Sequence, residues 1–326
     1  MNGKIYNLKE LIEYFNNKEK KPIIVNTIIN ENDKNNVKKI INLNEFVEPK
    51  EEPKEEPKEE LKEELKEEPN NSEDITIVSA YFKVPNKYNN DELYNTWIEK
   101  FLTNLNKNIV IFTSIECFYF IKNLRKDFED KTMIIITSLE NFYVYKYYEY
   151  FIKDYNRDIE KAYHNPKLFL IWNEKFKFVE KAIKLNPFNS AYFMWCDIGI
   201  IRDPKYLKYL KTFPNSKKIT EDKIYLLNID YNFTEENYKN PYDEKYRFIF
   251  NTIGCGIVCG SEKNMRLWIN RYYKTFDYYI LNNKFAGKEQ NIMVSTYLKY
   301  PNFIKLIKGI EDETCDKWYY FLKYFS

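Results

Sequence analysis

Glycine and histidine are scarce in this chain of 326 residues, which contains seven glycines and a single histidine. One histidine excludes a metal site built from several histidines, and so little glycine argues against collagen-like and repeat sequences. The patterns GxGxxG and GxxxxGK[ST] are absent, which argues against a Rossmann dehydrogenase and a P-loop NTPase. No nucleophile elbow accompanies the histidine, so a Ser-His-Asp hydrolase has no support.

Cysteine and long apolar runs are also limited. The five cysteines are scattered and none has zinc-finger spacing, so the sequence favours a reducing compartment over a disulfide framework. The sequence shows no signal peptide and no apolar run of about 18 residues. These absences predict a soluble, cytoplasmic protein without a transmembrane segment.

Aromatic and charged residues are abundant, at 18% and 31% of the chain. The net charge is only +2, but residues 48–69 carry 11 Glu and 5 Lys, which leaves about +8 on the rest. A moderately basic body suits a phosphate-bearing ligand. The excess is too small to predict a nucleic-acid partner.

The acidic segment divides the chain into three parts. Its repeated K-E-E-[P/L] pattern combines glutamate repulsion with helix-breaking proline, which predicts an extended linker over residues 48–73. Residues 1–47 contain one amphipathic stretch and one apolar run, too little for an independent core. We expect them to form a small appendage that docks a partner, and residues 74–326 to form the main domain.

Strand and helix patterns alternate along residues 74–326. The apolar patterns predict strands at 75–82, 108–114, 132–138, 191–197 and 224–230, and another at NTIGCGIVCG. Helices are predicted at 91–105, 115–128, 140–160, 168–185 and 265–276, and an amphipathic one from Glu289. This alternation indicates an α/β fold with a Rossmann-type mixed, mostly parallel sheet flanked by helices.

The stretch YFMWCDIGIIRD, from Tyr192 to Asp203, holds the strongest candidate for a functional acid. Asp197 follows an apolar strand, and open α/β sheets bind ligands in the crevice beyond the carboxyl ends of their strands. Its carboxylate is either a ligand of Mg²⁺ or Mn²⁺ on a diphosphate or the cap of the next turn. Gly199 permits a close ligand, and Arg202 binds either phosphate or Asp203.

One lysine lies on or beside the apolar stripe of the predicted helix 168–185. Lys175 shares a helical face with Trp172, Val179 and Ala182, whereas the neighbouring charged residues point elsewhere. A lysine in this position either binds an anion or extends its ammonium group to solvent.

Two further candidate segments lie near the end of the chain. In NTIGCGIVCG, Asn251 and Gly254 belong to a strand whose small residues admit either a ligand or a packed helix against the backbone. Glu289 and Gln290 begin a predicted helix. The acid is either favoured there by the helix dipole or is the base that takes a hydroxyl proton.

The blocks TIVSAYF, IVIFTS, HNPKLFLIWNEKFKFVEKAIKLNPF and FMWCDIGIIR, in this order, resemble the HtrL/YibB-like family of glycosyltransferase-related proteins. The resemblance covers residues 75–203 and, more loosely, the remainder, and it implies a GT-A nucleotide-sugar fold. It implies that Asp197 is the first aspartate of an Asp-x-Asp motif and binds Mn²⁺ or Mg²⁺ on the donor diphosphate. The second aspartate is Gly199 here, so Lys175 or Arg202 is expected to supply part of the positive charge.

The resemblance also assigns roles to other segments. Ser79, Ala80 and Tyr81 are expected to meet the base and ribose of the donor. The segment with Asn251 and Gly254 resembles the acceptor strand of retaining GT-A enzymes. The segment GKEQNIM resembles their acid-glutamine helix, which would place Glu289 and Gln290 near the anomeric centre.

Together these features predict a glycosyltransferase that moves a sugar from a nucleotide-sugar donor, expected to be UDP-linked, to a hydroxyl group of a glycan or protein. The first alternative is a catalytically inactive carbohydrate- or nucleotide-sugar-binding scaffold, because the second aspartate is missing and aromatic rings stack on sugars. The second is a nucleotidyltransferase, which would require a glycine-rich, lysine-bearing loop after the first strand. The segment AYFKVPNKY lacks one.

Overall fold

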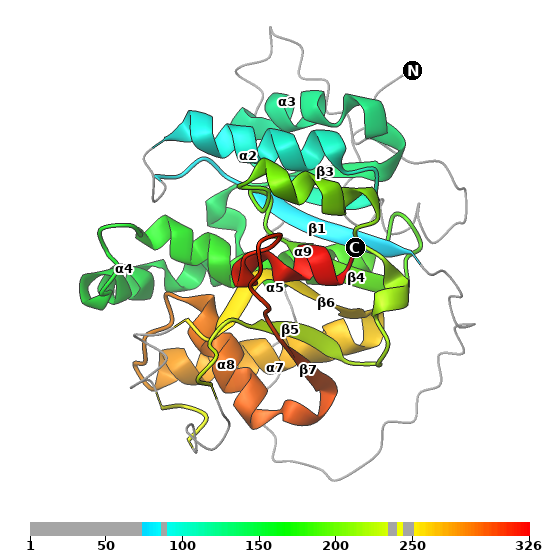
Figure 1. Cartoon of the computed structure of the whole chain (residues 1–326). Helices are drawn as coiled ribbons and strands as arrows, with labels where there is room; N and C mark the ends of the chain where they lie inside the picture. Colours follow the sequence, from blue (N-terminus) through cyan, green and yellow to red (C-terminus); the bar gives the residue numbers. More distant parts are fainter. Residues whose placement is uncertain (1–73, 86–89, 234–239, 244–250) are drawn as a thin grey trace, which may run out of the picture.

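Seven strands rich in β-branched and aromatic residues form one sheet in the computed structural model, which describes residues 74–85, 90–233, 240–243 and 251–326 (Figure 1). The expected appendage and linker, residues 1–47 and 48–73, lie outside the described residues. The strands, in chain order, are β1 Ile75–Tyr81, β2 Ile109–Thr113, β3 Thr132–Ile136, β4 Tyr192–Cys196, β5 Ile224–Asn228, β6 Ile253–Ser261 and β7 Ile304–Lys308.

The sheet has the order β3-β2-β1-β4-β6-β5-β7. Its pairings are parallel except that β6 is antiparallel to both of its neighbours, β4 and β5. All the described strands other than β6 therefore run in one direction, which confirms the expected mixed, mostly parallel sheet. The reversal of β6 brings its first residues to the edge where β4 ends, because antiparallel neighbours begin and end at opposite edges.

Helices lie on both faces of this sheet (Figure 1). The α-helices are α2 Asp91–Asn104, α3 Ile115–Leu124, α4 Tyr148–Arg157, α5 Pro166–Leu185, α7 Glu262–Leu281, α8 Glu289–Lys299 and α9 Tyr320–Tyr324. The 3₁₀ segments are η3 Lys126–Lys131, η4 Leu139–Asn141, η5 Tyr143–Tyr147, η6 Pro204–Lys211, η7 Ser216–Lys218, η9 Pro301–Phe303 and η10 Lys317–Tyr319. Among the described helices, none has the length and apolar character that crossing a bilayer requires. The five cysteines are free thiols.

Alternate strand residues face two separate hydrophobic cores. Ile75, Ile77 and Tyr81 of β1 belong to the core shared with α2, α3, η6 and α9. Val78 and Ala80 belong to the core shared with α5, α7 and α8. This alternation is the two-residue period of a strand, and burial on both faces explains why the strands read as nearly continuous apolar runs.

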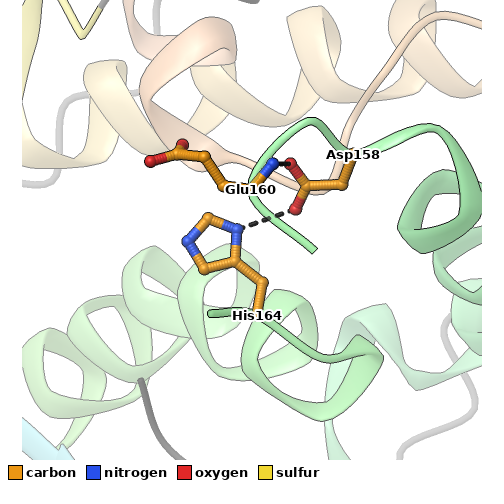
Figure 2. Close-up of side chains that lie close together, drawn as sticks. All are labelled: Asp158, Glu160 and His164. Carbon is orange, nitrogen blue, oxygen red and sulfur yellow. Dashed lines mark hydrogen bonds and ion pairs between the residues drawn. The ribbon is translucent and has the colours of Figure 1, made fainter. Parts of the chain in front are cut away.

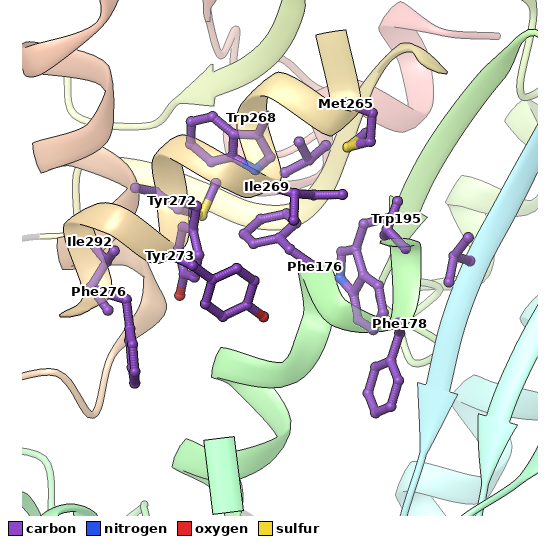
Figure 3. Close-up of a cluster of buried hydrophobic side chains, with 14 of the residues drawn as sticks. Phe176, Phe178, Trp195, Met265, Trp268, Ile269, Tyr272, Tyr273, Phe276 and Ile292 are labelled. Carbon is purple, nitrogen blue, oxygen red and sulfur yellow. The ribbon is translucent and has the colours of Figure 1, made fainter. Parts of the chain in front are cut away.

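Aromatic packing fixes α5 against β4 and α7, as Figure 3 shows. The ring centroid of Phe176 lies 4.7 Å from that of Tyr272 and 5.5 Å from that of Trp268, both on α7. Phe178 stacks on Trp195 of β4 with centroids 6.3 Å apart. Such edge-to-face and stacked pairs contribute about 0.5–1.5 kcal/mol each beyond the area that they bury. They hold the middle of α5 beside the end of β4.

The structure corrects two helix predictions. The stretch 140–160 is not one helix but the 3₁₀ segments η4 and η5 followed by α4. The helix predicted from Glu289 is α8, and it is buried on all sides over residues 289–297 rather than amphipathic. The physical reason is its position, since α8 contacts β6, α7 and α5.

Two smaller details concern α2 and β7. The N-cap of α2 is Asn90, whose side chain accepts a hydrogen bond of 2.9 Å from the N–H of Leu93, and Asp91 lies in the first turn. Strand β7, which pairs with β5 at the edge of the sheet, was not predicted. Its sequence, IKLIK, is too short and too polar to stand out as a strand.

Candidate functional site

Asp197 is the first residue beyond β4 and lies at the carboxyl edge of the sheet. Its N–H donates to the carbonyl of Gly256 in the reversed strand β6, at 2.8 Å. Its carboxylate Oδ1 accepts a hydrogen bond of 2.8 Å from Trp195 Nε1. The side chain is 40% exposed and, among the described residues, makes no capping bond to the following turn. Asp197 therefore faces the crevice.

Lys175 is the centre of a buried ionic cluster. Its Nζ lies 3.0 Å from Asp197 Oδ1 and 2.8 Å from Glu289 Oε1, and it also donates to the carbonyl of Cys255 at 3.4 Å. Burial by itself would lower the pKa of Lys175, but attraction to Asp197 and Glu289 outweighs it and raises that pKa well above the ordinary value. The ammonium group does not extend to solvent, so that alternative is wrong.

Glu289 reaches Lys175 because the segment before α8 is held from two sides. The carboxylate Oδ2 of Asp154 in α4 accepts hydrogen bonds from the N–H groups of Ala286 and Gly287, at 2.6 and 2.8 Å. The side-chain amide of Asn173 in α5 donates to the carbonyl of Ala286 at 3.0 Å. A Cβ at Gly287 would lie only 2.7 Å from the ring of Phe169, so this close approach requires glycine.

The ionic cluster forms the floor of a cavity of about 530 Å³. Four carboxylates and three cationic groups line it: Glu160, Asp197, Glu289 and Asp316, with Lys175, Arg202 and Lys288. A second cavity of about 80 Å³ lies over the end of β1 and is lined by Ala80 and Tyr81. The two cavities share Lys175 and Asp197, so they meet at the ionic cluster.

The structure brings most of the predicted site residues into these two cavities. The larger one is lined by Asp197, Lys175, Arg202, Asn251, Glu289 and Gln290, and the smaller one by Ala80 and Tyr81. The guanidinium group of Arg202 lies 4.9 Å from the ring centroid of Trp97. The amide of Gln290 donates to the carbonyl of Ile253 at 2.6 Å, which ties α8 to β6.

Two predicted residues line neither cavity. The hydroxyl of Ser79 is buried and donates to the carbonyl of Cys196, which ties β1 to β4 inside the sheet. Gly254 packs against the side chains of Leu227 and Ile229, and an added Cβ would lie 3.2–3.3 Å from them. These neighbours belong to β5 and to the residue after it, not to the helix that the packing alternative for the NTIGCGIVCG segment expected.

Several residues that sequence reasoning missed line the larger cavity. They are Glu160, Tyr163, His164, Lys288 and Trp318, which come from the loop after α4, the start of α8 and the segment before α9. The only local signal was the position of these residues in loops. Their convergence depends on how the elements pack, which no short-range pattern encodes.

Asp158, Glu160 and His164 have the composition of a metal site, and their ligand atoms lie within 4.8 Å of one another (Figure 2). Both carboxylate oxygens of Asp158 are already used, one by the N–H of Glu160 at 2.8 Å and the other by His164 Nδ1 at 2.7 Å. Glu160 pairs with the ammonium group of Lys288. The cluster therefore fixes the loop and attaches it to α8.

Asp197 fits a different kind of cation site. Both of its side-chain contacts within the described residues use Oδ1. Gly256 lies beside the other oxygen, and a Cβ added there would lie 3.7 Å from Oδ2 and 3.1 Å from Ile200 Cδ1. A single carboxylate is sufficient for Mg²⁺ when the substrate phosphates and water supply the other ligands. Gly199 offers no second carboxylate.

A protein-family model matches residues 73–325, and it is described as a bacterial protein of unknown function, HtrL_YibB. The chain belongs to this family. Protein HtrL of Escherichia coli strain K12 is 28% identical over 149 residues, which are 44% of this chain and 49% of HtrL. The chain thus spans about half the length of the curated relative that it matches.

Two solved structures resemble the chain at low sequence identity. One is the apo form of mouse xyloside xylosyltransferase 1, with 12% identity, a TM-score of 0.38 and coverage of 72% of this chain and 85% of that one. The other is 4-diphosphocytidyl-2C-methyl-D-erythritol synthase from Anaerococcus prevotii, with 10% identity, a TM-score of 0.36 and coverage of 76% and 94%.

Proposed function

We propose that this protein is a glycosyltransferase that uses a nucleotide-sugar donor and binds the donor diphosphate at Asp197. The observation that carries the proposal is the buried Lys175, held between Asp197 and Glu289 at the floor of the larger cavity. This cluster lies at the carboxyl edge of the parallel strands, where α/β folds bind their ligands. The cluster holds the partly exposed carboxylate of Asp197 in a fixed position at that cavity.

The charge of the cavity argues for a divalent cation. Its four carboxylates outnumber its three cationic groups, so the lining carries a net charge of −1 when His164 is neutral. A diphosphate entering alone would meet this negative charge, and Lys175 is already neutralised by its two partners. Mn²⁺ or Mg²⁺ bound to Asp197 Oδ2 would remove the repulsion and neutralise the charge that develops on the leaving nucleoside diphosphate.

The remaining roles follow from this placement. Ala80 and Tyr81 line the smaller cavity of about 80 Å³, to which we assign contact with the base of the donor. Arg202 supplies a planar donor group to phosphate oxygens. Glu289 contacts Lys175 from the start of α8, and we assign Glu289 and Gln290 to the region of the anomeric centre, with Glu289 taking the proton of the acceptor hydroxyl.

A thermal-shift screen with nucleotide sugars and free nucleoside diphosphates, with and without Mn²⁺, tests the proposal. A ligand that binds only the folded protein adds about 2.7 kcal/mol of stability at 100 times its dissociation constant, which raises Tm measurably. We expect stabilisation by one UDP- or GDP-linked sugar that depends on Mn²⁺, and release of the nucleoside diphosphate on turnover. No stabilisation by any nucleotide would contradict the proposal, and release of pyrophosphate would indicate a nucleotidyltransferase.

A binding scaffold without turnover is the second candidate. It is favoured by the engagement of both expected catalytic side chains in the fold, Glu289 with Lys175 and Gln290 with the carbonyl of Ile253. Stabilisation by a nucleotide sugar, with no release of nucleoside diphosphate in the presence of a broad set of glycan acceptors, would identify this function.

A further inference from the structure

Two exposed aromatic rings line the larger cavity. Trp318 is 40% exposed and Tyr163 is 51% exposed, and both line this cavity but not the smaller one. The other described tryptophans are buried or half-buried. Tryptophan is a strongly buried residue on average, so an exposed one on a cavity wall marks a surface that a ligand covers.

Trp318 is held outward by a well-fixed turn. It lies in η10, where its backbone N–H donates to the carboxylate of Asp316 at 2.8 Å. Both sequence neighbours of Trp318 are also packed. The ammonium group of Lys317 lies 4.5 Å from the ring centroid of Tyr231, and the ring centroids of Tyr319 and Tyr206 are 4.8 Å apart. The turn therefore presents the indole to the cavity without needing a ligand to order it.

Tyr163 belongs to the loop between α4 and α5, which is fixed just as firmly. Its N–H donates to the carbonyl of Glu160 at 2.8 Å. The hydrogen bond between Asp158 and His164, drawn in Figure 2, closes the same loop. Two segments far apart in the sequence thus contribute one exposed ring each to the lining of the same cavity.

The surroundings of these rings indicate the class of ligand. A sugar ring has an apolar face of C–H groups that packs on aromatic rings, and hydroxyl groups at its edge that need hydrogen-bond partners. The same cavity offers such partners in the side chains of Asp316, Glu160 and Asn251. Flat rings with scattered carboxylate and amide groups suit a carbohydrate better than a peptide, which would need backbone partners.

We propose that Trp318 and Tyr163 form the subsite for a sugar ring of the acceptor, so that the acceptor is a carbohydrate rather than an unmodified protein side chain. The inference rests on the proposed function, in which the donor base lies at the smaller cavity and its diphosphate lies at Asp197. Because the two cavities meet at Asp197, the part of the larger cavity that Trp318 and Tyr163 line is left for the molecule that receives the sugar.

Calorimetric titration with methyl glycosides of glucose, galactose and N-acetylglucosamine, and with their disaccharides, tests the subsite on the full chain. We expect the wild type to bind at least one of these probes and Trp318→Ala to bind it about 10-fold or more weakly, with a smaller loss for Tyr163→Ala. Trp318→Phe should retain most of the affinity. Tyr119→Ala removes a 61% exposed ring of α3 outside both cavities and should leave affinity unchanged.

Each result decides the inference. It is overturned if the wild type binds none of these saccharides, or if Trp318→Ala binds them as the wild type does. It is also overturned if Trp318→Ala loses the Mn²⁺-dependent stabilisation by a nucleotide sugar, because the ring would then serve the donor. Saccharide binding that depends on Trp318, in a protein that no nucleotide sugar stabilises, would refute the proposed transferase while the subsite stands.

Discussion

Glu174 and Lys175 are neighbours on α5, and both are buried, but their side chains contact different segments of the fold. The carboxylate of Glu174 accepts hydrogen bonds from the backbone N–H groups of Tyr143 and Val144, at 3.0 and 3.1 Å, which fixes the 3₁₀ segment η5. The ammonium group of Lys175 contacts Asp197 and Glu289 at the cavity floor.

The comparison separates a buried charge that supports the fold from one that we propose to serve the candidate site. Burial raises the pKa of Glu174 to about 7, against the opposing effect of Lys181, so the fold tolerates this charge at a cost. The partners of Lys175 are themselves cavity residues, and one of them, Asp197, is partly exposed. A buried ion pair is weak evidence that the pair stabilises the fold. Its role is better indicated by whether its members line a cavity.

The largest effect is expected from Lys175→Met. Removal of the ammonium group leaves Glu289 buried without its partner, which typically costs about 3–5 kcal/mol of unfolding free energy. We also expect turnover to be lost. Urea unfolding and donor hydrolysis measure the two effects. The control is Lys184→Met, on the exposed side of the same helix, and equal stability of the two variants would refute the central role of Lys175.

Asp197→Asn should separate function from stability. The amide oxygen can still accept from Lys175 and Trp195, while the nitrogen replaces the carboxylate oxygen that we assign to the cation. We expect turnover to fall by on the order of 100-fold or more, with Tm nearly unchanged. Donor hydrolysis at several Mn²⁺ concentrations measures this loss. Asp203→Asn, which alters an exposed N-cap of η6, is the matched control, and full activity of Asp197→Asn would remove the metal role.

Glu174 should make stability depend on pH without affecting turnover. Because its folded pKa is raised from 4.5 to about 7, the folded state binds the proton more tightly. The contribution of Glu174 to the free energy of unfolding is thus fully present below about pH 4.5 and is lost as pH rises through 7. The loss is on the order of 3 kcal/mol. Urea unfolding between pH 4.5 and 8 measures it.

Glu174→Gln provides the control for this pH dependence, because glutamine resembles the neutral acid. We expect the variant to show a flatter dependence of unfolding free energy on pH and wild-type turnover. Asp154, whose pKa burial raises to about 6 against the effect of Arg157, should account for part of the remaining slope. An unchanged slope in Glu174→Gln would show that another group is responsible.

The smallest effect is expected from deletion of residues 1–69. Among the described residues, which all follow position 73, the sheet, two hydrophobic cores and the two cavities are already formed. We therefore expect the shortened chain to keep the Tm and the donor hydrolysis of the full chain. Loss of folding on this truncation would show that the first part of the chain belongs to the domain.

Much of the fold was predictable from local patterns. The strands β1, β2, β3 and β4 and the helix α5 lie close to their predicted positions, because apolar runs and the helical period are properties of neighbouring residues. The placement of Asp197 at a strand end and of Lys175 on an apolar stripe was predictable for the same reason. Strand β7 and the burial of α8 were not, since edge pairing and neighbouring helices decide them.

The sequence by itself determined most of the segments that become strands and helices, and that one acid and one lysine stand at exceptional positions along them. Only the tertiary structure decided that these two meet each other and Glu289. Their contact requires that β6 runs antiparallel to β4 and that α5 packs on β4. It also requires the hydrogen bonds of Asp154 and Asn173 that fix the segment before α8. Local periodicity determines which residues share one face of a helix or strand. Which faces contact one another depends on packing between residues far apart in the sequence, and no short stretch of sequence contains that information.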